Sequence, residues 1–181
     1  MNRSRRRHSI RAFETRDANA VAALFAAYMH ETYGAPSVMT PEVLLRDGQG
    51  LRFSLMIATD SNDEPVGFAA WRDAYDLHNA VAGGEIPDLF VASAHRGWAL
   101  SIRLAAAVAR AVQARGGLYL RSEVLTDDTR RLRLLHRVTV GFHGETVYVS
   151  GRAFRQLAEL SDSDPRTLVR MLPLPAASRE P

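Results

Sequence analysis

A strand, a long helix and a second strand follow one another between Glu85 and Val124, and this stretch limits the fold more than any other. The helix between the strands carries one apolar stripe and ends at a pair of glycines. Two strands joined in this way pair in parallel through a right-handed crossover. The stripe consists of Leu100, Leu104, Ala107, Val108 and Ala111, and the glycines are Gly116 and Gly117.

The rest of the chain predicts a mixed α/β fold in which antiparallel strands precede the crossover. Residues 53–57 and 66–71 alternate as strands on either side of a turn, which is typical of a hairpin. Residues 75–84 are polar, end in glycine and predict a loop. Further strands are expected at 9–13, 85–91, 118–124 and 145–150, and helices at 15–33, 40–47, 97–115, 128–138 and 152–160.

The composition fits one soluble domain. Of 181 residues, 46% are hydrophobic and 24% charged. The chain has no cysteine, which excludes disulfides, thiolate metal sites and a cysteine nucleophile. This composition fits a cytoplasmic protein. The histidine spacing predicts no metal, and the apolar runs are too short for a membrane partner. We expect a disordered basic N-terminus (1–8), a folded domain (9–160) and a loosely ordered tail (161–181).

Four arginines crowd the N-terminus, at positions 3, 5, 6 and 7. Such a cluster is either a nucleic-acid-binding arm or a solvated terminus. We favour the solvated terminus and expect no nucleic-acid partner, because the net charge of the whole chain is only +3.

The junction between the strand ending at Val91 and the following helix is a candidate anion site. Small residues stand at positions 97, 99 and 101, where they let a ligand approach the backbone. The free N–H groups of a first helical turn bind anions such as a pyrophosphate, and Arg96 adds a cation. An ordinary strand-to-helix turn has similar residues, so the local pattern alone leaves both interpretations open.

The element order and this junction resemble the GNAT N-acetyltransferase superfamily. The family motif R/Q-x-x-G-x-G/A corresponds to Arg96-x-x-Ala99-x-Ser101, preceded by a strand end similar to the family's, residues 88–91. Ala99 and Ser101 replace the two motif glycines. The resemblance covers roughly residues 10–150 and implies a mixed, mostly antiparallel sheet of about seven strands, with one parallel crossover, that binds acetyl-CoA.

The resemblance also implies how the cofactor binds. Its pantetheine arm would run along the strand with backbone contacts at Phe90 and Val91 and with the thioester near Leu89. Its pyrophosphate would meet the amides of the junction, which are those of Arg96, Gly97, Trp98, Ala99, Leu100 and Ser101. Pro87 supports a bulge, since proline removes a strand donor, although an edge strand would also accept it.

An amine must lose a proton to attack a thioester, and a nearby carboxylate can take it. Glu85 and Asp88 are the candidates. Their spacing puts them on opposite faces of a regular strand, so only one should face the site unless a bulge resets the alternation. We favour Glu85, which stands where some GNAT enzymes carry their base. A salt-bridged acid at a strand start is the alternative.

The family's usual proton donor to the leaving thiolate is a tyrosine in the helix after the fifth strand. Leu135 occupies that position here and cannot donate. The remaining candidates are Tyr148, Tyr119 and His136, or the thiolate leaves without assistance.

The sequence therefore predicts an N-acetyltransferase that moves acetyl from acetyl-CoA to a primary amine of a small molecule or peptide by direct attack. Because the motif glycines are replaced and the usual tyrosine is missing, the alternative is a non-catalytic domain that binds CoA or a protein. A homodimer is also left open.

Overall fold

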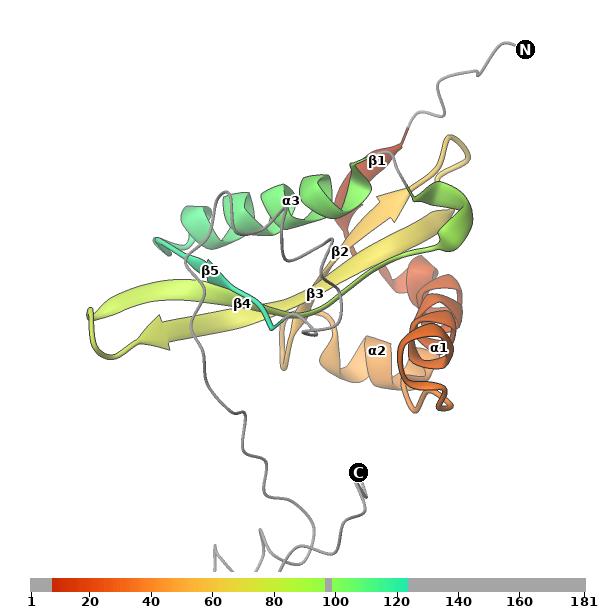
Figure 1. Cartoon of the computed structure of the whole chain (residues 1–181), viewed down its shortest axis with the longest axis horizontal. Coiled ribbons are helices and arrows are strands. Elements are labelled where there is room, and N and C mark those ends of the chain that lie inside the picture. Colours follow the sequence, from red (N-terminus) through yellow and green to blue (C-terminus); the bar gives the residue numbers. More distant parts are fainter. Residues whose placement is uncertain (1–7, 97–98, 124–181) are drawn as a thin grey trace, which may run out of the picture. The chain divides into compact units, whose positions relative to one another are not determined.

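The computed structural model describes residues 8–96 and 99–123 (Figure 1). The described elements follow the predicted order, with short 3-10 turns at Thr15–Asp17 and Ser93–His95. They are β1 (Ser9–Ala12), α1 (Ala18–Tyr33), α2 (Pro41–Asp47), β2 (Ser54–Thr59), β3 (Pro65–Asp76), β4 (Val81–Val91), α3 (Leu100–Ala114) and β5 (Leu120–Arg121). The helices predicted at 128–138 and 152–160 and the strand at 145–150 lie outside the described residues.

The strands form one sheet in the order β1-β2-β3-β4-β5. All neighbours pair antiparallel except β4 and β5, which are parallel and connected through α3. The mixed, mostly antiparallel sheet with one crossover is thereby confirmed. Five strands are seen in the described part, and the expected total of about seven extends beyond it.

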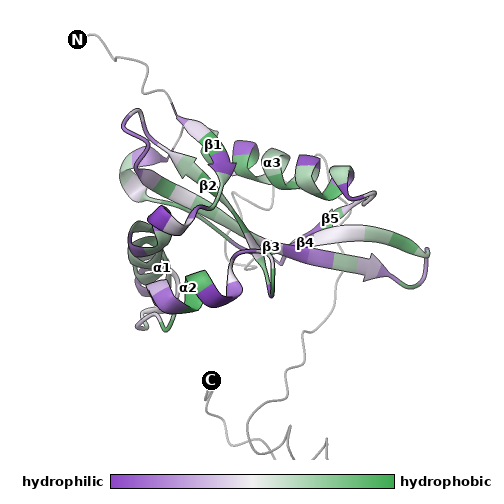
Figure 2. Ribbon diagram, turned by 180° about the vertical axis from the view of Figure 1, so that it is seen from behind, coloured by the Kyte–Doolittle hydropathy of each residue, from purple (hydrophilic) through white to green (hydrophobic). Residues whose placement is uncertain are grey.

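Helices cover both faces of the sheet, α3 on one and α1 with α2 on the other (Figures 1 and 2). On the α3 face, the buried side chains include Trp71, Ile86, Val91, Leu104 and Val108. On the α1 face they include Val21, Phe25, Leu44, Phe68 and Phe90. Because neighbouring strand residues alternate between faces, these two clusters identify the face of each residue on β3 and β4.

A buried ion pair, and not Thr15, organises the start of α1. Asp17 is the N-cap and only 3% exposed. It accepts hydrogen bonds from Arg11 at 2.6 and 2.8 Å and from the Glu14 N–H at 2.8 Å. The helix predicted from residue 15 therefore begins later, at Ala18, since a 3-10 turn precedes it. The predicted end is right, because Gly34 adopts the left-handed conformation that closes α1.

The polar loop predicted at residues 75–84 is also wrong. Apart from a short turn these residues are strand, with Tyr75 opposite Ala82 in the register of β3 and β4. The glycines that suggested a loop are needed for close packing. A Cβ added to Gly83 would lie 2.3 Å from Tyr119 Cε1, and one added to Gly84 would lie 2.5 Å from Val112 Cγ2.

The folded part includes His8, which the sequence assigned to the N-terminal arm. His8 is buried, and its Nε2 lies 3.1 Å from Nδ1 of His95 in the turn after β4. Among the helices of the described residues, none combines the length and apolar character that a bilayer crossing requires.

Candidate active site

A β-bulge interrupts β4 beside the predicted catalytic acids. Ala70 pairs with Asp88 and Arg72 with Glu85, so one residue of β3 lies opposite two of β4, Ile86 and Pro87. A bulge leaves its extra residue unpaired, which suits Pro87 because it has no N–H. The bulge interpretation is confirmed. In the sheet order β4 lies between β3 and β5, and within the described residues β5 pairs only with Gly84 and Glu85, before Pro87.

The bulge changes which way the two acids face. Ile86 and Val91 belong to the α3 face, and Phe90 to the α1 face. Alternation from Ile86 puts Glu85 on the α1 face, and alternation from Phe90 puts Asp88 there too. The expectation that only one acid faces the site is corrected, because the extra residue between them restores a common face.

Past the bulge, β4 has an edge that β5 does not pair in the described residues. The parallel pairing consists of Gly84 with Leu120 and Glu85 with Arg121. Further along, the Ala92 N–H donates to the carbonyl of Val66 on β3 at 3.0 Å. By alternation, the backbone groups of Leu89 and Val91 then point away from β3, toward this open edge.

The same alternation corrects the backbone contact expected at Phe90. Its N–H and carbonyl point to β3, and its carbonyl lies 2.8 Å from where a Cβ on Gly67 would stand. The Phe90 side chain is only 6% exposed, in the core under α1. Leu89 and Val91 are therefore the strand residues whose amides face the open edge.

The first turn of α3 lies just beyond this edge. Its N-cap, Ala99, has φ of 53° and ψ of 23°, the left-handed conformation that glycine adopts without steric cost. Ser101 is exposed, whereas the Leu100 side chain is buried at 2% exposure. The N–H groups of a first helical turn have no partner within the helix, so this turn can bind an anion through its backbone.

The Arg96 side chain is engaged in contacts with residues of β4 and α1. Its Nε donates to the Val91 carbonyl at 2.9 Å, and a terminal nitrogen donates to Glu31 on α1. Its guanidinium carbon also lies 5.5 Å from the centre of the Phe90 ring. Arg96, the cation expected to bind a pyrophosphate, thus connects α1 to the end of β4 in this structure. Gly97 and Trp98 lie outside the described residues.

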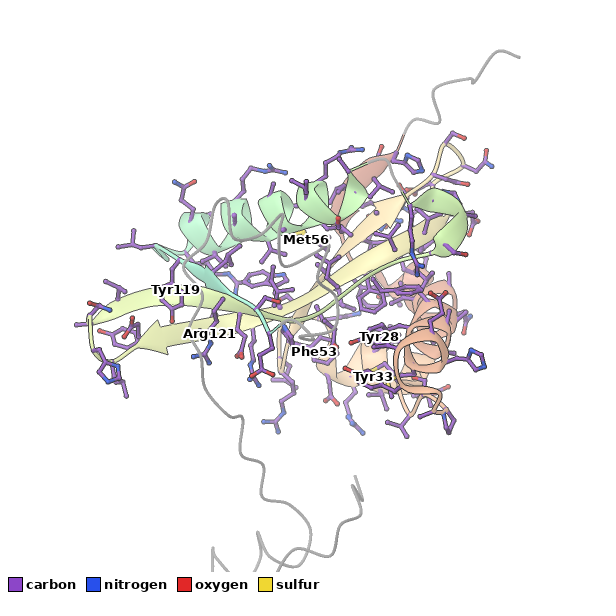
Figure 3. The ribbon with its side chains drawn as sticks, viewed as in Figure 1. Tyr28, Tyr33, Phe53, Met56, Tyr119 and Arg121 are labelled. Atoms are coloured by element: carbon purple, nitrogen blue, oxygen red, sulfur yellow. The ribbon has the colours of Figure 1, made fainter. Side chains whose placement is uncertain are left out.

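Asp88 is joined to α1 by a tyrosine. The Tyr28 hydroxyl donates to Asp88 Oδ1 at 2.6 Å and lies 3.4 Å from the Tyr33 hydroxyl. Figure 3 shows both tyrosines extending from α1 toward the sheet. Burial raises the pKa of Tyr28 far above its usual value, and the hydrogen bond to Asp88 adds to this. Tyr28 is therefore protonated and donates to the carboxylate.

Glu85 lies in a different environment, between two arginines. Oε2 accepts from Arg72 Nε at 2.6 Å and from a terminal nitrogen of Arg121 at 3.3 Å. The hydrogen bond from Arg72 is the main reason that the pKa of Glu85 is lowered. Burial opposes this effect, and the hydrogen bond from Arg121 adds a smaller lowering contribution. A carboxylate stabilised in this way is a weak proton acceptor.

Two of the three candidate proton donors, Tyr148 and His136, lie outside the described residues. Leu135, at the position of the family's usual tyrosine, also lies outside them. Tyr119 is described, and its ring lies against Gly83 on the neighbouring strand (Figure 3). That contact is a packing role for this tyrosine.

A family model for GNAT acetyltransferases matches residues 12–142. The chain belongs to the GNAT acetyltransferase family. No curated protein sequence matched it. This GNAT protein is therefore an acetyltransferase by family, and the bulge of β4 and the first turn of α3 lie inside the matched range.

Solved structures support the same fold. A ribosomal-protein-alanine N-acetyltransferase from Brucella melitensis biovar Abortus 2308 is 19% identical, with a TM-score of 0.64 over 80% of this chain and 99% of that one. An aminoglycoside acetyltransferase from an uncultured soil metagenomic sample is also 19% identical, with a TM-score of 0.63 over 80% and 99%. An integron cassette protein from V. cholerae reaches 0.69 at 14% identity, over 84% and 98%.

Three polar side chains near the acids were not identified as functional from the sequence. Tyr28 and Arg121 lie inside the helix predicted at 15–33 and the strand predicted at 118–124, and Arg72 directly follows the strand predicted at 66–71. A tyrosine in a buried stripe signals a hydroxyl that needs a partner, so Tyr28 was detectable in principle. The arginines gave no signal, because only the sheet register brings them to Glu85.

Proposed function

We propose that this protein transfers acetyl from acetyl-CoA to a primary amine of a small molecule or peptide by direct attack. The observation that carries the proposal is the open edge of β4, which leads from the bulge to the first turn of α3. A backbone edge beside an anion-binding turn suits a ligand with an amide-bearing arm and a pyrophosphate. The absence of cysteine fits such an enzyme in the cytoplasm.

In this proposal the cofactor is held mainly by backbone groups. Leu89 and Val91 would hydrogen-bond the pantetheine arm as an added strand, and the amides of Leu100 and Ser101 would bind the pyrophosphate. Small side chains at positions 99 and 101 leave the approach to that turn open. Arg96 would help indirectly by fixing the carbonyl of Val91, with no contact to phosphate required.

Asp88 is the better candidate for the base. Its carboxylate is held by Tyr28, whereas Glu85 is engaged by two arginines. The amine nitrogen would attack the thioester carbon to give a tetrahedral intermediate, whose collapse breaks the carbon–sulfur bond. The proton lost by nitrogen would pass to Asp88 directly or through water, and the CoA thiolate would leave. Tyr148 remains a candidate for protonating that thiolate.

The first experiment separates cofactor binding from catalysis. Acetyl-CoA at one hundred times its Kd should stabilise the folded protein by about 2.7 kcal/mol in a thermal-shift assay. Ser101→Trp should abolish this stabilisation while leaving the unliganded protein folded, because the ring blocks the turn. Normal binding by the Ser101→Trp variant would place the cofactor elsewhere.

The second experiment distinguishes the two acids. Free thiol released from acetyl-CoA is measured with a panel of primary amines. Asp88→Asn should lower kcat by about 10²-fold or more at neutral pH with unchanged acetyl-CoA affinity. Glu85→Gln is the matched variant and should lower kcat much less. The reverse ranking would assign the base to Glu85, and binding without thiol release for any amine would favour a non-catalytic domain.

A further inference from the structure

An arginine pair lies on the same face of the sheet as Asp88. Arg72 on β3 lies next to Glu85 in the register, and Arg121 lies next to it on β5. Trp71 and Leu120 pack toward α3, so by alternation Arg72 and Arg121 face the other way, as Asp88 does. Figure 3 shows Arg121 beside β4, the strand with which β5 pairs. The pair is therefore on the side from which an amine would approach the thioester.

Glu85 holds both arginines in place and accepts from only some of their N–H groups. The Glu85 side chain is only 14% exposed, whereas those of Arg72 and Arg121 are 57% and 59% exposed. A guanidinium carries five N–H groups in a fixed fork, and each arginine uses one nitrogen for Glu85. Within the described residues, no other hydrogen bond of either guanidinium group is found. Glu123 also attracts Arg72, as the smallest contribution to its raised pKa.

The acidic groups that could have attracted a cationic acceptor are engaged elsewhere. Glu31 pairs with Arg96, and Asp73 pairs with Arg115 at 3.1 Å on the α3 face. Asp76 accepts hydrogen bonds from His78 and Asn79 in the hairpin turn. Each of these three carboxylates already accepts from a donor of the chain itself.

We infer that Arg72 and Arg121 bind an anionic group of the acceptor, which makes the substrate an amine that also carries a carboxylate or phosphate. The pair is a binding site for an oxyanion, since a fork of N–H donors matches carboxylate and phosphate oxygens. The register partners of Asp88 and Glu85 on β3 are two residues apart, about 7 Å. The anionic group should then lie only a few bonds from the nitrogen. This inference rests on the proposed function.

Anion binding is tested first, without turnover, in protein saturated with CoA. The Nε–H resonance of Arg72 is assigned by its loss in Arg72→Gln and followed by NMR during titration. The probes are two matched pairs: 3-aminopropanoate with propylamine, and 2-aminoethyl phosphate with ethylamine. A saturable shift is expected with the two amines that carry an anionic group, and none with their partners that lack it. No shift with either anionic amine at tens of millimolar would overturn the inference.

Kinetics with the same amines test whether this site selects the substrate. In at least one pair, the amine with the anionic group should have a kcat/KM about tenfold or more above that of the partner without it, and the preferred pair distinguishes carboxylate from phosphate. Arg72→Gln and Arg121→Gln should each remove most of this preference, mainly through KM. Arg115→Gln removes a similarly exposed arginine on the opposite face and should preserve it.

The two proposals fail in different ways. Resonance shifts without thiol release for any amine would keep the anion site and refute amine acetylation. Thiol release with equal kcat/KM for the members of both pairs, and with no shift, would keep the enzyme and refute the arginine site.

Discussion

The ion pair between Arg11 and Asp17 gives the sharpest stability prediction, tested by Asp17→Asn. This pair joins β1 to the start of α1 and is the best buried charge contact in the described part of the chain. Asparagine keeps the shape and can still accept the Glu14 N–H. It removes the negative charge, however, and its amide group must either turn away or face the guanidinium of Arg11.

The expected loss follows from the geometry. Breaking a buried ion pair by removing one partner costs about 3–5 kcal/mol. Here Asp17 is 3% exposed but Arg11 is 20% exposed, and Asp63 also accepts from Arg11 at 3.1 Å. These two features lower the estimate to about 2–4 kcal/mol. For a protein of this size, that corresponds to a fall in Tm of about 6–12 °C.

The pH dependence gives an independent check. Burial by itself raises the pKa of Asp17, but the hydrogen bonds from Arg11 and from the Glu14 N–H outweigh it, so the pKa is lowered. A lowered pKa in the folded state means that the stabilisation is complete above the unfolded value of about 3.9. It is lost as the pH falls through the lower folded value. The difference between wild type and variant should therefore be constant from pH 7 to 5 and shrink below about pH 4.

Urea denaturation followed by circular dichroism measures this free energy at pH 7, 5 and 3.5. Asp63→Asn is the control, since it removes the exposed partner of the same arginine and should have a much smaller effect. A loss below about 0.5 kcal/mol in Asp17→Asn at pH 7, or a difference that grows toward pH 3.5, would refute the reasoning.

Two further predictions concern the site. Gly84→Ala should destabilise the fold by about 1–3 kcal/mol and weaken acetyl-CoA binding, because its Cβ would lie 2.5 Å from Val112 Cγ2 and 2.9 Å from Leu120 Cδ2. Thermal denaturation with and without acetyl-CoA measures both effects, and unchanged stability would contradict the packing. Tyr28→Phe should lower kcat about fivefold with unchanged KM for acetyl-CoA, since Asp88 loses the donor that orients it. The Tyr33 hydroxyl lies 3.4 Å from that of Tyr28, and Tyr33→Phe should lower kcat less. Equal kcat values in the wild type and both variants would show that Tyr28 takes no part in the reaction.

The local sequence was enough to predict most element boundaries. Helix starts and ends follow from short-range chemistry, as at Thr40, whose side chain accepts from the Val43 N–H, and at Gly34 with its left-handed backbone. The order of strand, helix and strand was enough for the parallel crossover. The element order, together with the position of the motif frame at Arg96 and Ala99, was enough for the resemblance to the family. None of these inferences needs a contact between residues far apart in the chain.

Only the tertiary structure decided how the side chains of the site are arranged. The bulge at Pro87 brings Glu85 and Asp88 to one face, and its position depends on the register against β3. The strand of residues 75–84 was hidden because its glycines serve the packing of Tyr119 and Val112, which come from elsewhere in the chain. Pairings such as Tyr28 with Asp88 join residues 60 positions apart, and a pattern within one segment carries no information about such partners.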